Sequence, residues 1–170
     1  MRRTTAILGS AIFLVIAPGT VAGFIPWWMT RWEFAPPLAG IAAFRLLGAA
    51  MIAAGLPVIL DSFARFAIEG LGTPVIFLPP QHLVVTGWYR HVRNPMYVAI
   101  ASLILGQGLL FGRVRVLEYG AVVWAIFYFF VRIYEEPHLR GNFGKEYEEY
   151  CANVPRWIPR LRPWAGPAAT

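Results

Sequence analysis

The chain contains one cysteine, Cys151, so no disulfide can form within it. A zinc site built from Cys-x-x-Cys pairs is excluded for the same reason, and nothing in the sequence depends on an oxidising compartment. Cys151 is interpreted as a residue without a special role. His82 and His138 do not have the spacing of metal ligands, so we predict no metal.

Charged residues are also scarce, at 14% of 170 residues, whereas 58% are hydrophobic and 15% aromatic. One soluble domain of this length does not need so much apolar surface to fill its core, so we predict an integral membrane protein. The net charge of +6 does not indicate nucleic-acid binding, because the basic residues lie between apolar runs and leave no soluble module. Membrane lipids with anionic headgroups are the expected partners.

Apolar runs predict an all-α fold with four transmembrane helices, at residues 6–29, 38–60, 95–111 and 117–134. The first run continues to Trp27 and Trp28 without a small-residue cleavage site, so we expect a membrane helix and not a signal peptide. A tight turn, Gly-Arg-Val-Arg-Val, predicts a hairpin of the last two helices.

Local features of these runs predict bends and contacts. Pro18-Gly19 predicts a kink in the first helix, which neighbouring helices must stabilise by satisfying the freed backbone groups. Small residues four apart in the second run are expected to let another helix approach closely. These are Ala49 with Ala53 and Ala50 with Ala54. Gly106 and Gly108 are interpreted as packing residues, with a cofactor role as the alternative.

Two segments lie outside the predicted spans. Residues 61–94 are too long for a turn and too interrupted by Gly and Pro for a span, so we expect interfacial or re-entrant backbone that lines a polar cavity. Residues 136–154 predict a broken amphipathic helix with Phe143, Tyr147 and Tyr150 on one face. Without a repeat or a soluble second domain, residues 1–170 are expected to form one membrane domain, with a two-helix part at 1–64.

The distribution of cations predicts the orientation. With a cytoplasmic N-terminus, one set of cations lies inside: Arg2, Arg3, Arg65, Arg90, Arg93, Arg132, Arg140, Lys145, Arg156, Arg160 and Arg162. Arg31, Arg113 and Arg115 lie outside. This asymmetry predicts cytoplasmic N- and C-termini, in the cell inner membrane. The connection 61–94 and the C-terminal segment then share the cytoplasmic face and are expected to meet over the ends of the last two helices.

A polar cluster is predicted at that meeting point. Arg90, His91 and Arg93 precede the third span, and Glu135-Glu136 end the fourth. A carboxylate at the C-terminal end of a helix opposes the helix dipole, so a cation should compensate it: Arg132 one turn back, Arg93 across the cavity, or a ligand. Headgroup anchoring and simple solvation are the alternatives for either half alone. Cations, a carboxylate and aromatics beneath a lipid-facing groove suit a zwitterionic cofactor and a lipid-like substrate.

Two motifs carry a resemblance to a known family. The first is "PPQHLVVTGWYRHVRNPMYVA", with a Leu-Val, a Gly-x-Tyr and an Arg-x-Pro-x-Tyr pattern, and the second is "EEPHLRGNFGKEYEEYCANVPRWIP". Together they resemble the isoprenylcysteine carboxyl methyltransferase and phospholipid methyltransferase family of integral-membrane enzymes, over roughly residues 78–160. The chain departs from the family pattern at Asn94, usually histidine, and at Ala99, usually glycine.

The resemblance implies a methyltransferase that uses S-adenosylmethionine, bound between the two motifs in the part 65–170. The implied cofactor-binding residues are Gln81, His82, Leu83, Val84, Tyr89, Asn94, Pro95, Met96, Tyr97 and Glu135. Arg132 lies near the position of a substrate-binding arginine of the family, and Arg156 could reach back to the site. Methyl transfer depends mainly on alignment, so no catalytic residue is certain, and His91 is a possible base.

Several alternatives stay open at this point. The substrate could be a prenylcysteine-type carboxylate, an isoprenoid acid or a phospholipid amine, and nothing indicates an oligomeric state. A membrane reductase of the steroid-reductase type, with NADPH as cofactor, is the second hypothesis. A non-catalytic protein with a decayed pocket is the third, because of Asn94 and Ala99. Arg45, inside the second span, could be functional, could extend to the headgroups or could pair with Glu118.

Overall fold

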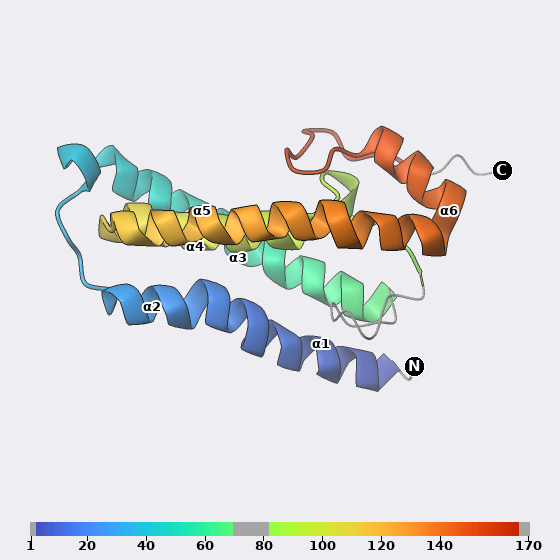
Figure 1. The fold of residues 1–170 in the computed structure, drawn as a ribbon, viewed down its shortest axis with the longest axis horizontal. Coiled ribbons are helices and arrows are strands. Elements are labelled where there is room, and N and C mark those ends of the chain that lie inside the picture. Colours follow the sequence, from blue (N-terminus) through green and yellow to red (C-terminus); the bar gives the residue numbers. More distant parts are fainter. Residues whose placement is uncertain (1–2, 70–81, 167–170) are drawn as a thin grey trace.

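The computed structural model describes residues 3–69 and 82–166, and every regular element in these ranges is helical (Figure 1). The elements are α1 (Arg3–Pro18), η1 (Gly19–Phe24), α2 (Ile25–Thr30), η2 (Leu38–Gly40), α3 (Ala43–Glu69), η3 (Gly87–Arg90), α4 (Pro95–Phe111), α5 (Val114–Phe130), η4 (Val131–Glu135) and α6 (Glu136–Asn153). η1 and η4 are π-helices, and η2 and η3 are 3₁₀-helices. The all-α prediction is confirmed for the described residues.

Three helical segments in the described ranges are long and apolar enough to cross a membrane: Ala11–Thr30, Ala43–Arg65 and Val114–Asn153. The predicted third span corresponds to α4, a shorter apolar helix of 17 residues. α4 packs against both α3 and α5, and it begins at Pro95 as expected (Figure 1). α4 and α5 form the predicted hairpin, joined at Gly112, whose left-handed φ of 69° ends α4.

The kink predicted at Pro18-Gly19 is the π-helix η1, which joins α1 and α2. A π-turn leaves carbonyl groups without their usual partners, and two side chains of the hairpin occupy them. Gln107 donates from Nε2 to the Ala22 carbonyl at 2.7 Å, and the Tyr119 hydroxyl donates to the Val21 carbonyl at 2.9 Å. The Gln107 amide oxygen accepts a hydrogen bond from Trp32 Nε1 at 3.2 Å. The irregular turn is therefore stabilised by the helices beside it.

We expect Gln107→Leu to destabilise the protein by about 1–3 kcal/mol, because a buried carbonyl and an indole N–H lose their partner. Tyr119→Phe removes one hydrogen bond and should cost about 0.5–1.5 kcal/mol. Thermal unfolding of both variants in one detergent measures the difference. Unchanged stability of Gln107→Leu would contradict the role given to this amide.

The close contact between α3 and α4 is made by glycines and not by the predicted alanines. A Cβ on Gly48 would lie 2.5 Å from the Gly106 carbonyl oxygen, and one on Gly55 would lie 3.2 Å from the Ala99 oxygen. The alanines of the prediction are all exposed, so that prediction is wrong. They are Ala49, Ala50, Ala53 and Ala54. The position of Gly106 agrees with a packing role.

The second predicted span ends later than expected. α3 continues beyond Leu60 to Glu69, so the part of the connection that begins at Asp61 is helical and not re-entrant. Asp61 and Arg65 form an ion pair at 2.9 Å one turn apart, and Phe63 is buried against α1, where it stacks on Phe13. A helical ion pair and a buried ring thus extend the helix past its apolar run.

Arg45 binds the loop that precedes α3, and the pair with Glu118, one of the alternatives left open by the sequence, does not form. Its Nη2 donates to the Ala35 carbonyl at 2.6 Å, and its guanidinium lies 5.2 Å from the centre of the Phe34 ring. The cation is therefore used to hold the chain at this end of α3.

Beyond α5 the chain stays helical through η4 into α6, which is interrupted at Gly144, where φ is +49°. Tyr147 and Tyr150 are buried with Val154, and Phe143 packs against them. The predicted broken amphipathic helix, with these aromatics on one face, is confirmed.

Candidate functional site

The segment that precedes α4 lies against the segment that follows α6, which we call the tail (residues 154–166). Three backbone hydrogen bonds join them: Arg93 N–H to the Pro155 carbonyl at 2.9 Å, Arg160 N–H to His91 at 2.9 Å, and Trp164 N–H to Arg90 at 3.0 Å. The Arg90 guanidinium also donates to the Trp164 carbonyl. The predicted meeting of these two regions is therefore confirmed.

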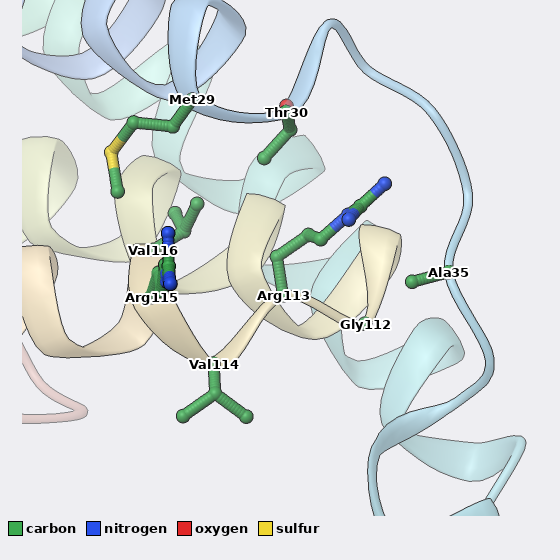
Figure 2. Close-up of a pocket in the computed structure, with 8 residues that line it drawn as sticks. All are labelled: Met29, Thr30, Ala35, Gly112, Arg113, Val114, Arg115 and Val116. Atoms are coloured by element: carbon green, nitrogen blue, oxygen red, sulfur yellow. The ribbon is translucent and has the colours of Figure 1, made fainter.

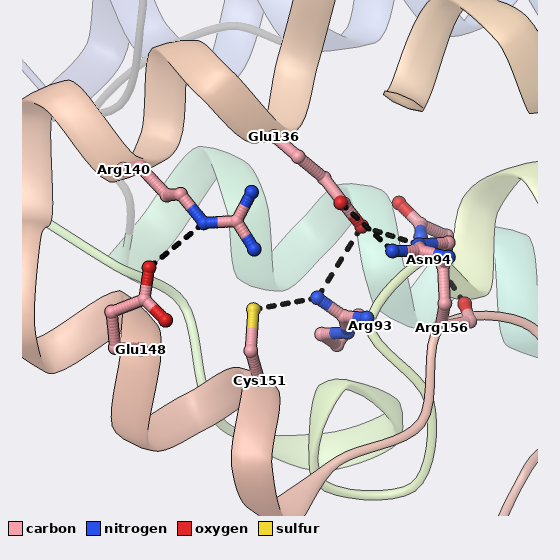
Figure 3. Close-up of polar contacts among 7 residues, drawn as sticks. All are labelled: Arg93, Asn94, Glu136, Arg140, Glu148, Cys151 and Arg156. Atoms are coloured by element: carbon pink, nitrogen blue, oxygen red, sulfur yellow. Dashed lines mark hydrogen bonds and ion pairs between the residues drawn. The ribbon is translucent and has the colours of Figure 1, made fainter. Parts of the chain in front are cut away.

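Glu136 is the centre of a buried ion cluster at this junction (Figure 3). Its side chain is 5% exposed and contacts two guanidinium groups. Arg156 donates from Nε at 2.5 Å and from Nη2 at 3.0 Å, and Arg93 Nη1 lies 3.3 Å from the same carboxylate. The hydrogen bond with Glu136 raises the pKa of Arg156 above its ordinary value. The cluster links the start of α4, the start of α6 and the tail.

Two polar neighbours extend the cluster (Figure 3). Arg93 Nη1 donates to Cys151 Sγ at 2.6 Å, so Cys151 has a partner that its isolation in the sequence did not indicate. Asn94, which is buried, donates from Nδ2 to the Arg156 carbonyl at 3.1 Å. Asn94 therefore uses its amide to fix the tail, a donor role that its neutral side chain can fill at any ordinary pH.

Glu135 lies beside this cluster but has a different partner. The Tyr97 hydroxyl donates to Glu135 Oε2 at 2.8 Å, and the Tyr97 ring lies 4.8 Å from the Phe127 ring. Within the described part of the chain, no cation forms an ion pair with Glu135. The structure thus joins the first turn of α4 to η4 through a carboxylate that has a hydroxyl partner and, among residues 3–69 and 82–166, no cationic one.

Arg132, predicted to compensate the two glutamates or to bind substrate, is exposed and points elsewhere. Its Nη1 donates to the Tyr128 hydroxyl at 2.7 Å, and its guanidinium lies 5.5 Å from the centre of that ring. The π-helix η4 explains the difference, because its wider turn changes the faces on which residues three and four apart lie. The cations that compensate Glu136 are Arg93 and Arg156.

The remaining predicted residues surround the junction in different ways. His82 is exposed, Leu83 packs against the α6 tyrosines, and Val84 is buried. Tyr89 is buried, and its carbonyl accepts a hydrogen bond from the Tyr150 hydroxyl at 2.7 Å. Pro95 and Met96 belong to the start of α4 and pack inward. Gln81 lies outside the described residues.

His91 is held by the tail. Its Nδ1 lies 2.8 Å from the Arg160 carbonyl oxygen, and its ring lies 5.5 Å from that of Trp88. A carbonyl can only accept, so Nδ1 carries the proton in this contact, and in the neutral ring Nε2 is then the acceptor.

A hollow lies at the opposite end of α4, where the chain turns into α5 (Figure 2). Met29, Thr30, Ala35 and residues 112–116 line it. None of the predicted site residues is among them, so this hollow is separate from the candidate site.

The fold and the site together define a helical membrane protein with a polar site at one end of a helix pair. Residues 43–146, more than half of the chain, match the family model described as phospholipid methyltransferase. The chain therefore belongs to the phospholipid methyltransferase family.

Similar curated proteins include two methyltransferases and a reductase. The Schizosaccharomyces pombe protein-S-isoprenylcysteine O-methyltransferase is 40% identical over 82 residues, 47% of this chain and 34% of that protein. The Arabidopsis thaliana protein-S-isoprenylcysteine O-methyltransferase B is 35% identical over 79 residues, 45% of this chain and 39% of that protein. The Gallus gallus Delta(14)-sterol reductase is 34% identical over 74 residues, 43% of this chain and 12% of that protein. The chain thus matches little more than a third of either methyltransferase.

Proposed function

We propose that this protein transfers a methyl group from S-adenosylmethionine to a lipid-like substrate at the cytoplasmic face of the inner membrane. The observation that carries the proposal is the Tyr97–Glu135 contact, which joins the two family motifs at a carboxylate without an ion-pair partner in the described part of the chain. In this arrangement α4 is a fourth transmembrane helix, and both termini are cytoplasmic. The names of the family and of the two curated methyltransferases support the reaction class.

The residues at the junction fit the proposed cofactor. A carboxylate without a cation can accept hydrogen bonds from a ribose or from a methionyl ammonium. The Tyr97 and Phe127 rings, 4.8 Å apart, present aromatic surface of the kind that attracts a sulfonium. S-adenosylmethionine, when bound, supplies a methyl group that its sulfonium already activates. We assign cofactor binding to Glu135 and Tyr97, with further contacts from residues 94–96, from residues 82–84 and from Tyr89. Gln81, the other residue of this set, lies outside the described residues.

The chain's own contribution is mainly alignment and the exclusion of water. The ion cluster at Glu136 links the start of α6 to the segment before α4. Glu135 directly precedes α6, and Tyr97 lies in the first turn of α4, so the cluster lies next to both binding residues. For an amine substrate, His91 Nε2 is the proposed acceptor of the released proton, since Nδ1 is held by the Arg160 carbonyl. For a carboxylate substrate no base is needed. Arg132, exposed on η4, is the proposed contact for an anionic substrate group.

The test is a methyl-transfer assay on purified protein with total membrane lipids and with prenylcysteine analogues, followed by mass identification of the product. A methylated lipid or prenylcysteine is the expected result. The assay also distinguishes the substrate classes, because prenylcysteine carboxylates, isoprenoid acids and phospholipid amines give products of different mass. No methylated product from any of them would contradict the proposal.

A membrane reductase is the second candidate, because the similarity to the Delta(14)-sterol reductase covers a comparable share of this chain. A thermal-shift titration with S-adenosylmethionine, S-adenosylhomocysteine and NADPH separates the candidates, since a bound ligand stabilises the folded state. We expect stabilisation by the first two. Stabilisation by NADPH alone would favour the reductase, and stabilisation by none would favour a protein without a working pocket.

We expect Tyr97→Leu to reduce methyl transfer at least about tenfold, or 1.4 kcal/mol, because the variant loses both the aromatic face and the hydrogen bond to Glu135. Tyr97→Phe keeps the ring and should lose less. Steady-state rates and cofactor affinity of the two folded variants test this order. Parent activity and parent affinity in Tyr97→Leu would remove Tyr97 from the site.

A further inference from the structure

The tail carries large apolar side chains that no other part of the described chain covers. Ile158 is 79% exposed and Leu161 is 98% exposed. They flank Pro159 and Arg160 in a segment that has no helix, so the exposed apolar surface belongs to a short loop. Exposure of such large apolar side chains to water is unfavourable, and burial in an apolar medium stabilises them. This loop therefore favours an apolar partner.

The position of the loop along α5 indicates which partner. The tail returns beside α5 and does not extend away from the helices (Figure 1). The Trp157 ring lies 4.8 Å from that of Trp124 and 6.2 Å from that of Tyr128. Counted from Val114, Trp124 lies about 15 Å and Tyr128 about 21 Å along the helix. Both residues belong to the apolar run 117–134 that the sequence predicts as a membrane span, so Trp157 contacts the middle of that run.

Prolines and two hydrogen bonds reduce the number of free N–H groups in the backbone of the loop. Irregular backbone at membrane depth must not leave N–H groups without partners. Pro155, Pro159 and Pro163 have no N–H, and the N–H groups of Arg160 and Trp164 bind carbonyls of the segment before α4. The proline spacing thus removes part of the desolvation penalty that another loop of this length would incur.

The arginines of the loop are compatible with insertion. Arg160 Nη1 donates to the Asn153 carbonyl at 2.7 Å, so the charge of Arg160 is directed to the end of α6. Arg162 is exposed, and a side chain of its length can place its charge among anionic headgroups while its stem stays in apolar surroundings.

We propose that residues 157–161 are inserted in the acyl-chain region of the leaflet next to the candidate site, with Ile158 and Leu161 against lipid chains. The bilayer then holds the tail in place, and the tail in turn supplies Arg156 to Glu136 and a carbonyl to Asn94. The inference concerns a lipid-binding surface and does not require the protein to be a methyltransferase.

Spin-label accessibility in phospholipid nanodiscs tests the insertion. A label is attached at Leu161→Cys, and separately at Ile158→Cys, in a Cys151→Ser background, where serine retains an acceptor for Arg93. Collision rates with oxygen, which concentrates in lipid, and with a polar nickel chelate, which stays in water, are measured for each label. Ile126→Cys on the exposed face of α5 is the lipid reference, and Glu146→Cys on the exposed face of α6 is the aqueous reference.

We expect the ratio of oxygen to nickel collision rates at both loop positions to match that at Ile126 and to exceed that at Glu146 severalfold. A ratio equal to that at Glu146 would place the loop in water and overturn the proposal. Low collision rates with both reagents would show that a second protein copy covers the loop, which also overturns it. The result is independent of any activity measurement, so failure here and failure of the proposed reaction are distinguishable.

Discussion

Glu136→Gln should destabilise the folded protein by about 3–5 kcal/mol, the expected result of removing one partner from a buried ion cluster. The glutamine keeps the size of the side chain but leaves Arg93, whose side chain is 9% exposed, without a counter-charge. Arg156 loses its carboxylate as well. The measurement is the free energy of unfolding in mixed micelles, or the unfolding temperature in one detergent.

Glu148→Gln is the matched control. Glu148 forms an ion pair with Arg140 at 2.8 Å, but the two side chains are 60% and 46% exposed. An ion pair so exposed is worth about 0–1 kcal/mol, so this variant should unfold close to the parent. Equal effects of the two substitutions would mean that the cluster at Glu136 does not hold the junction together.

Glu135→Gln should weaken S-adenosylmethionine binding by about 1–3 kcal/mol, or roughly 5- to 150-fold in Kd, because a charge-assisted hydrogen bond becomes a neutral one. Stability should change less than in Glu136→Gln, since Glu135 has no ion-pair partner among the described residues and glutamine can still accept from Tyr97. Titration calorimetry on the detergent-solubilised protein measures the affinity.

Glu149→Gln, an exposed position on α6, controls for the loss of one negative charge. Its Kd should equal that of the parent. If Glu135→Gln folds and binds the cofactor with parent affinity, Glu135 does not hold the cofactor, and the adjacent glutamates have only a structural role.

The sequence predicted that the two regions meet, but it did not predict which side chains pair where they meet. Cations before α4 and carboxylates after α5 indicated that the two regions meet, and the hydrogen bonds between them agree. The sequence could not assign the partners of Glu135 and Glu136, because the π-turn η4 changes the directions in which these two adjacent side chains point. From the sequence, Arg156 could be expected to reach the site but not to pair with Glu136, because its position depends on how the tail folds back.

Helix faces in the membrane were harder to predict for a different reason. A helix that is apolar all round gives no periodicity that separates its lipid face from its protein face. Small residues therefore marked α3 as a packing helix, but Gly48 and Gly55 make the contact and the neighbouring alanines are exposed. Glycine and alanine look alike in such a pattern, and only the position of α4 distinguishes them.

The unbroken helical path from α5 through η4 into α6 connects the candidate site directly to an apolar helix. Between Val114 and the interruption at Gly144 the chain is one helical rod of about 45 Å, longer than a hydrocarbon core of about 30 Å. The apolar run of the rod ends near Tyr134, so its polar end, residues 135–143, extends beyond that run, whereas α4 has 17 residues and no such extension. Tyr97 lies on the short helix and Glu135 at the point where the rod leaves its apolar run, so a change in the tilt of one helix relative to the other alters the separation between these two side chains.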